Sequence, residues 1–245
     1  MKIAEIYKFL NELSPFETQE GWDNSGLIIG SPHDEVSQIY LSLDIDFELL
    51  NEVKPNSLII THHPLIFKGL KSINSSLYPS SLITRMIKKD ISLISLHTNY
   101  DLSHLNEYVA SEILGFKEYK KDEFLLYADV DFSFDELCEF VKEKFYLKTI
   151  RVARAQETSS SDKIRRIALC TGSGGDLISK VKADVFISGD FKYHQALEAR
   201  INGLNLIDIG HFETERYFGA SLAKYLQNFP IATIITNSKN PFTYC

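Results

Sequence analysis

Residues 57–64 read SLIITHHP, a short apolar run that ends in two adjacent histidines and a proline. An apolar run of this length predicts a buried strand over residues 57–61. In sheets of parallel strands, functional side chains gather where the strands end. The stretch therefore predicts one strand of such a sheet and, directly after it, a candidate site at His62 and His63.

Predicted helices and strands alternate on both sides of this stretch. Apolar residues at helical spacing predict an opening helix from about Ile3 to Leu13. Further strands are expected at 39–44, 91–96, 125–132, 149–155, 165–172, 184–190, 204–210 and 231–237, and further helices at 46–53, 80–89, 104–114, 134–145, 176–181, 193–201 and 213–227. This alternation predicts an α/β fold with a largely parallel sheet or sheets.

The chain length of 245 residues suits one large domain or two smaller ones. Segment 115–124 (GFKEYKKDEF) is charged and poor in apolar residues. We therefore expect a boundary there, between an N-terminal α/β half over residues 1–118 and a C-terminal α/β half over residues 119–245.

Charge and composition exclude several classes of protein. The formal net charge is −7, which argues against a surface that coats nucleic acid, because neutralising phosphates requires basic residues. No apolar run approaches the length of a membrane span, and the N-terminal residues lack the apolar core of a signal peptide. The cysteines Cys138, Cys170 and Cys245 lie far apart and form no C-x-x-C pair. We expect a cytoplasmic protein that does not bind membranes.

Polar and ionisable residues follow four of the predicted strands. They lie at 61–63, 97–101, 188–190 and 208–211. Because the carboxyl ends of parallel strands share an edge of the sheet, this pattern predicts a site built from several strand ends.

His62 and His63 are the strongest candidates for metal ligands, because neutral imidazole is the commonest metal ligand in proteins. Adjacent side chains that leave an extended segment point apart, so the pair suits two neighbouring ions better than one. Pro64 favours an extended conformation at His63. The alternative is a pair of loop histidines with purely structural hydrogen bonds.

Two further pairs have the spacing of one helical turn. His211 and Glu215 lie on one face of a predicted helix, where a carboxylate can bridge two metals; the alternative is a favourable charge at the helix N-terminus. Asp101 follows His97 by four residues, in a predicted loop, and the alternative for it is a turn or a helix cap. The glycine-rich run at 172–175 favours a tight turn over a phosphate cradle, and Trp22 and Asp23 are interpreted as a packed side chain and a turn residue.

Six segments together resemble the NIF3 family of dinuclear metal centre proteins, also described as GTP cyclohydrolase 1 type 2. They are GWDNSGLIIG (21–30), THHPLIF (61–67), SLHTNYD (95–101), SGDFKYHQALEA (188–199), DIGHFETE (208–215) and NPF (240–242). They span the chain in the family order, and the length resembles the short bacterial form. The resemblance implies a NIF3-like fold of two α/β subdomains with parallel or mixed sheets flanked by helices.

The resemblance also implies a set of site residues. One divalent cation is expected on His63 and Asp101 and a second on His62 and His211, with Glu215 bridging both and serving as the candidate catalytic residue. His97, Tyr193 and His194 match further family positions that line the site and orient substrate or a water molecule. Separately from the resemblance, we expect Thr61 and Asp190 to hold the imidazole ligands in place.

Histidine and carboxylate ligands without thiolate suit Zn²⁺, Fe²⁺ or Mn²⁺. Two such ions lower the pKa of a shared water toward neutrality and so supply hydroxide. This favours a metal-dependent hydrolase, of the GTP cyclohydrolase or phosphoesterase type, acting on a nucleotide-like substrate. The rival hypothesis is a non-enzymatic metal-binding ring for metal storage, metal delivery or regulation. The family further implies a toroidal homohexamer.

Overall fold

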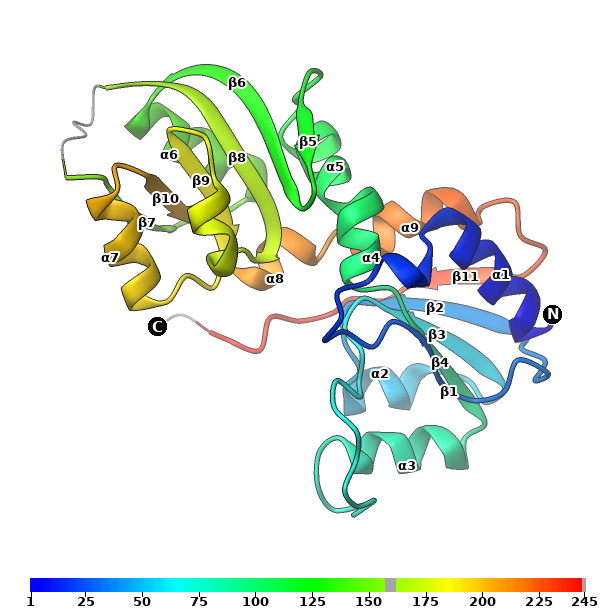
Figure 1. The fold of residues 1–245 in the computed structure, drawn as a ribbon. Coiled ribbons are helices and arrows are strands. Elements are labelled where there is room, and N and C mark those ends of the chain that lie inside the picture. Colours follow the sequence, from blue (N-terminus) through cyan, green and yellow to red (C-terminus); the bar gives the residue numbers. More distant parts are fainter. Residues whose placement is uncertain (157–161, 244–245) are drawn as a thin grey trace. The chain divides into compact units, whose positions relative to one another are not determined.

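The structure, a computed structural model, describes residues 1–156 and 162–243. It divides into two compact units, drawn in Figure 1. The first unit comprises residues 1–104 together with the segment that begins at Phe218, and the second comprises Leu105–Tyr217. This division differs from the expected halves 1–118 and 119–245, because the last strand of the chain pairs with a strand near its beginning.

The first unit contains a five-stranded sheet. Its order is β1 (Gly26–Ile29), β4 (Ile91–Ser95), β3 (Ser57–Thr61), β2 (Gln38–Ser42) and β11 (Ala232–Ile235). Strands β4, β3, β2 and β11 are parallel to their neighbours, and only β1 pairs antiparallel, with β4. The parallel α/β arrangement expected for this part of the chain is therefore confirmed.

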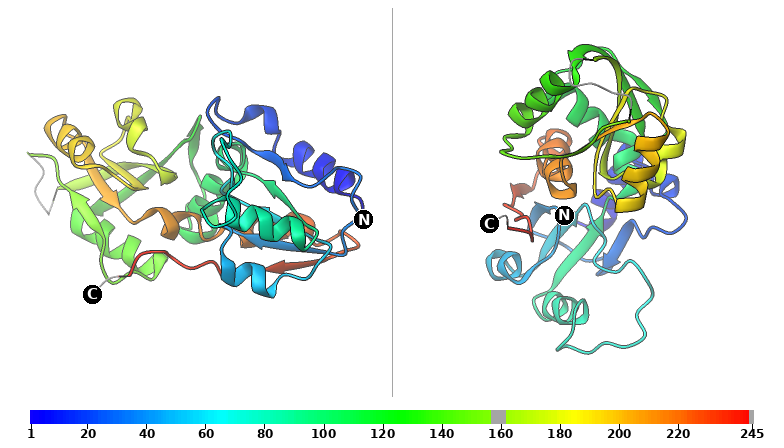
Figure 2. Two further views of the ribbon diagram at one scale, coloured as in Figure 1. Left: turned by 90° about the horizontal axis from the view of Figure 1, so that it is seen from below. Right: turned by 90° about the vertical axis from the view of Figure 1, so that its left-hand side faces the viewer.

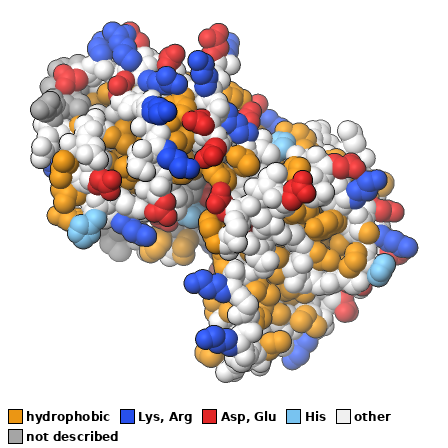
Figure 3. Space-filling model, in the orientation of Figure 1, with side chains coloured by type: hydrophobic (Ala, Val, Ile, Leu, Met, Phe, Trp, Pro, Cys, Tyr) orange, Lys and Arg blue, Asp and Glu red, His pale blue; other side chains and the backbone are white. Residues whose placement is uncertain are grey.

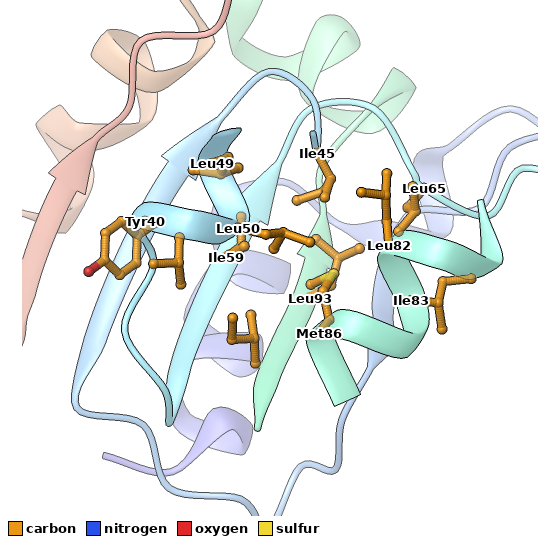
Figure 4. Close-up of a cluster of buried hydrophobic side chains, with 12 residues drawn as sticks. Tyr40, Ile45, Leu49, Leu50, Ile59, Leu65, Leu82, Ile83, Met86 and Leu93 are labelled. Atoms are coloured by element: carbon orange, nitrogen blue, oxygen red, sulfur yellow. The ribbon is translucent and has the colours of Figure 1, made fainter. Parts of the chain in front are cut away.

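Helices cover both faces of this sheet. Figures 1 and 2 show α1 (Ile3–Leu13) and α9 (Phe218–Leu226) over one face, and α2 (Phe47–Glu52) and α3 (Ser80–Lys88) over the other. Asp46 caps α2, because its side chain accepts a hydrogen bond from the Leu49 backbone N–H. The apolar side chains under α2 and α3 form the cluster in Figure 4, which includes Leu50, Ile59, Met86 and Leu93.

The second unit contains a six-stranded mixed sheet. Its order is β5 (Lys120–Asp122), β6 (Leu125–Ser133), β8 (Lys163–Ser173), β9 (Val185–Gly189), β10 (Asn205–Asp208) and β7 (Arg151–Ala153). The three central strands β8, β9 and β10 are parallel, while β5, β6 and β7 pair antiparallel with their neighbours.

Helices also flank this second sheet. Helix α7 (Tyr193–Ile201) and the 3₁₀ helix Gly175–Lys180 pack on one face, around Phe186 and Leu206, and α6 (Phe134–Phe145) covers the other (Figures 1 and 2). Helix α6 begins with a complete capping box between Ser133 and Glu136, as the sequence predicts.

Some elements differ from the sequence predictions. Helical structure begins at α4 (Thr98–Tyr100), continues through π-helical turns and α5 (Asn106–Tyr108), and ends at Ile113, so it starts before the expected residue 104. The helix expected at 213–227 is two helices, α8 (His211–Glu215) and α9. Strands β1 and β5 were not predicted, since both are short and β5 is wholly charged.

Basic and acidic side chains are mixed on one face of the second unit. On the second unit, the face shown in Figure 3 carries Lys and Arg side chains interspersed with Asp and Glu, rather than a continuous basic patch. No helix within residues 1–156 and 162–243 is long and apolar enough to cross a membrane. Cys138 and Cys170 are thiols, and Cys245 lies outside the described residues.

Candidate metal centre

Two neighbouring parallel strands of the first unit bring three histidines together. His62 and His63 follow the end of β3, and His97 follows the end of β4. One ring nitrogen of each histidine lies within 4.8 Å of those of the other two. The carboxyl ends of β3 and β4 therefore form a group of three imidazole donors, which we call the histidine group.

The expected divergence of His62 and His63 is wrong. Their ring centroids lie 5.1 Å apart, with the rings tilted at 49°. The expectation assumed an extended chain, but strand β3 ends at Thr61 and the backbone bends at both histidines. The bend allows adjacent side chains to lie side by side.

In each imidazole of the histidine group, Nδ1 lies within hydrogen-bonding distance of a carbonyl or carboxylate oxygen. Nδ1 of His62 lies 2.8 Å from the Leu96 carbonyl, Nδ1 of His63 lies 2.8 Å from Asp44 Oδ1, and Nδ1 of His97 lies 2.8 Å from Asp23 Oδ1. A carbonyl or carboxylate oxygen accepts a hydrogen bond from Nδ1–H, so in the neutral ring the lone pair is on Nε2. Metal-binding histidines are commonly oriented in this way.

Asp101 lies next to the histidine group. Its Oδ1 atom is 3.5 Å from Nε2 of His62, and both side chains are buried. The loop position expected for Asp101 is wrong, because the residue lies in a helical segment, at the start of the π-helical turn Asp101–Leu105. π-Helical turns occur frequently at functional sites.

Asp23 is a buried anchor rather than a simple turn residue. Its carboxylate is fully buried and accepts hydrogen bonds from the ring of His97 and from both the backbone N–H and the hydroxyl of Thr98. Burial raises the pKa of this carboxyl, but the hydrogen bonds and charge of His97, with the hydrogen bonds from Thr98 and Asn24, outweigh that effect. The pKa is held well below its usual range.

The second unit also places side chains that can bind a metal at the ends of neighbouring parallel strands. Asp190 follows β9 and His211 follows β10, which is parallel to β9. Nδ1 of His211 lies 2.8 Å from Asp190 Oδ2, and its Nε2 lies 2.9 Å from Glu215 Oε2. Glu215 is buried, with 2% of its surface exposed. The helical spacing of His211 and Glu215 therefore places both on one face of α8, as expected.

Glycines make room for these side chains. Gly172, on β8, has φ +66°, and a Cβ there would overlap the carboxylate of Glu215. A Cβ at Gly189 would lie 2.6 Å from the backbone nitrogen of His211. The tight turn expected at 172–175 is wrong for Gly172, which belongs to β8 and lies against Glu215.

The remaining predicted site residues lie as follows. The Thr61 hydroxyl donates to the His63 carbonyl at 2.8 Å, so it holds the backbone of the histidine pair rather than a ring. Tyr193 is exposed at the start of α7, where its ring meets that of His194 with centroids 5.2 Å apart. Tyr193 also lines a pocket of about 280 Å³ with Arg151 and Phe191.

Asp23 and Asp44 are partners of the histidines that sequence reasoning missed. Asp44 had a usable signal, because it ends the stretch predicted as a strand at 39–44, next to the strand that carries His62 and His63. Asp23 had no comparable signal, since its contact with His97 joins residues 74 positions apart. Trp22, expected to be packed, is 61% exposed.

Comparisons with known proteins agree on one family. The model of the family described as Duf34/NIF3 (NGG1p interacting factor 3) matches residues 1–241. A GTP cyclohydrolase 1 type 2 homolog of Campylobacter jejuni is 60% identical over 244 residues, which cover 100% of both chains. A GTP cyclohydrolase 1 type 2 of Helicobacter pylori strain J99 is 41% identical over 241 residues, covering 98% of this chain and 97% of that protein.

Solved structures show the same fold. The crystal structure of a Staphylococcus aureus hypothetical protein aligns with a TM-score of 0.87 at 29% sequence identity, covering 100% of this chain and 99% of that one. Reduced HcgD from Methanocaldococcus jannaschii aligns with a TM-score of 0.82 at 26% identity, covering 97% of this chain and 98% of that one.

Proposed function

Because this chain belongs to the Duf34/NIF3 family, we propose that it binds two divalent cations and uses them as a metal-dependent hydrolase. The substrate is nucleotide-like, and the reaction is of the GTP cyclohydrolase 1 type 2 kind. The names of the Campylobacter and Helicobacter relatives support this reaction class.

The orientation of the imidazoles is the observation that carries the proposal. In both units Nδ1 is held by a carbonyl or carboxylate, which leaves the lone pair of the neutral ring on Nε2. At the ends of β3 and β4, His62, His63 and His97 each have one ring nitrogen within 4.8 Å of those of the other two, and His62 and His63 belong to the proposed ligand set. Metal-binding histidines almost always have this arrangement, whereas a purely structural histidine has no need of it.

The donor types fit the proposed metals. The first unit offers the imidazoles of His62 and His63 and the carboxylate of Asp101, and the second offers His211 and Glu215. Imidazole and carboxylate donors without thiolate suit Zn²⁺, Fe²⁺ or Mn²⁺. We propose these five residues as the ligands of the two cations, with Glu215 as the bridging carboxylate.

The bound cations would supply Lewis acidity, which activates water and polarises an oxygen or nitrogen of the substrate. The protein supplies the positioning. Asp44 and the Leu96 carbonyl fix the rings of His63 and His62, and Asp190 fixes that of His211. Glu215, the proposed catalytic carboxylate, is kept from bulk water by its burial against Gly172.

Three other residues are proposed to act on the substrate. His97, the member of the histidine group that Asp23 holds, lies beside His62 and His63 and is suited to orient a substrate oxygen or nitrogen. Tyr193 and His194, exposed at the start of α7, are proposed to contact substrate.

The test is turnover of GTP by pure protein loaded with each metal in turn, followed by formate release. We expect formate with at least one metal and loss of the reaction in Glu215→Gln. Metal-loaded protein that releases no formate from GTP and hydrolyses no phosphoester would contradict the hydrolase proposal. Bound metal that passes to a partner protein without turnover would instead support the non-enzymatic ring.

We also propose that the protein is cytoplasmic and forms a homo-oligomer, a toroidal hexamer. The loop between β3 and α3 supports self-association, because it exposes the apolar side chains of Ile73, Leu77 and Tyr78. Light scattering on purified protein tests the proposed assembly, which predicts a mass of six chains at all working concentrations.

A further inference from the structure

We propose that Trp22 and Phe67 of the first unit bind the planar base of a nucleotide next to the histidine group. This inference rests on the proposed function, in which the substrate is nucleotide-like, and it names the residues that recognise the base. Neither residue belongs to the proposed ligand set.

Trp22 and Phe67 are large aromatic side chains that the fold leaves accessible. Trp22 is 61% exposed and Phe67 is 43% exposed. Both rings contact the imidazole of His97 edge to face, with centroid distances of 5.8 Å for Trp22 and 5.5 Å for Phe67. Two exposed aromatic rings on one buried histidine therefore form an accessible aromatic rim, the Trp22–Phe67 rim.

The turn that carries Trp22 is anchored by hydrogen bonds on both sides of this residue. The Asp23 backbone N–H donates to the Glu20 carbonyl, which closes a turn with Trp22 near its tip. The Glu20 backbone N–H donates to the Thr98 hydroxyl at 3.0 Å, and the Asp23 carboxylate accepts from Thr98. A ring on such an anchored turn loses little conformational freedom when a ligand stacks on it.

A direct hydrogen bond joins the two segments of the rim. The side-chain amide of Asn24 donates to the Ile66 carbonyl at 2.6 Å. Trp22 lies two residues before Asn24, and Phe67 follows Ile66 directly. The bond therefore fixes the spacing between the two aromatic segments.

The rim lies beside the proposed metal ligands. The ring of His97, which both aromatics contact, lies 5.1 Å from that of His62 and 5.4 Å from that of His63, centroid to centroid. A base stacked on the rim would place its ring atoms next to these donors. Every nucleobase has a π-face, and stacking on aromatic side chains is the common way in which proteins bind unpaired bases.

The charge of the neighbouring loop favours a nucleotide over an uncharged aromatic compound. Lys68 follows Phe67 directly, Lys71 lies four residues after Phe67, and both lysines are exposed. Their ammonium groups give this loop a local positive charge in a chain of net charge −7. A phosphate is the group that such a charge complements.

Trp22 is the only tryptophan in the sequence, so its fluorescence reports directly on the rim. The experiment titrates metal-loaded, full-length protein with GMP, AMP and ribose 5-phosphate, and free N-acetyltryptophanamide corrects for absorption by the bases. We expect saturable quenching by GMP or AMP and none by ribose 5-phosphate. No change with either nucleotide, or an equal change with ribose 5-phosphate, would overturn the inference.

Calorimetric titration with the better nucleotide then tests the two residues individually. We expect Trp22→Ala and Phe67→Ala to weaken binding by about fivefold to about 100-fold. The matched control is Ile87→Ala, which removes an exposed apolar side chain beside Asp90 and Asn56, near the opposite ends of the strands. Equal affinity in all four proteins would contradict a role for the rim.

Metal content, measured on the same preparations, separates this inference from the proposed function. Protein that contains metal but shows no nucleotide-dependent change at Trp22 rejects the rim alone. Protein that takes up no metal but shows the quenching rejects the metal proposal alone. Emission that changes on dilution without ligand would show a second copy covering Trp22, and this too would reject the rim.

Discussion

Gly172 lies so close to the carboxylate of Glu215 that a Cβ at position 172 would overlap it, while the backbone of Gly172 has φ +66°. Two independent constraints, the left-handed conformation and the contact, therefore require glycine at this strand position. Since Glu215 is the proposed bridging ligand, this contact links the backbone of β8 to metal binding.

Gly172→Ala is predicted to displace Glu215. We expect a loss of stability of about 1–3 kcal/mol from the strained backbone and overlap, together with a loss of bound metal. Gly203→Ala is the matched control, because Gly203 has φ +81° but no atom near its Cβ position. Thermal unfolding and elemental analysis of both variants test this prediction. Full metal content in Gly172→Ala would contradict the role of this contact.

Asp44→Ala is predicted to weaken metal binding without unfolding the protein. The Asp44 side chain is half exposed and contacts Nδ1 of His63, so its removal takes away the hydrogen bond that orients this ring and favours its tautomer. Loss of such a partner lowers metal affinity by about 10- to 100-fold. Competition with a chromophoric chelator measures the change. Glu52→Ala, an exposed carboxylate in α2, is the control and is expected to match the wild type.

The thiol of Cys138 is predicted to react only at high pH. Burial in α6 raises its pKa from 9.0 to about 11. A pKa that is higher in the folded than in the unfolded chain means that this thiol stabilises the fold below pH 9.0 and that the contribution is lost as pH rises through about 11. Alkylation, followed on the Cys138 peptide by mass spectrometry, is expected to be slow up to pH 9.0 and fast after denaturation. Equal rates in both states would contradict this.

Most of the fold follows from local sequence patterns. Strand β3 and the capping box at Ser133 are confirmed because each depends on a few neighbouring residues. Local patterns could not predict that the C-terminal strand belongs to the first unit, since β11 pairs with β2, which lies almost 200 residues earlier. Strand β5 consists only of charged residues, so it lacks the alternating apolar residues that predict a strand.

The candidate site shows the same limit. Its histidines and carboxylates are recognisable because they follow predicted strands, and parallel pairing brings neighbouring strand ends to one edge. Side-chain direction depends on the backbone beyond the strand. The bend at His62 and His63 and the long-range bond from His97 to Asp23 are tertiary features, so the sequence alone predicted divergent histidines and a simple turn.

Metal content per chain tests the central claim most directly. Untagged protein, purified without chelator and then exposed to Zn²⁺, Fe²⁺ or Mn²⁺, is analysed for bound metal beside His63→Ala and Glu215→Gln. We predict about two equivalents of one metal in the wild type and a clear loss in both variants. A folded wild-type protein that takes up none of these metals would contradict the dinuclear centre, and the proposed hydrolase with it.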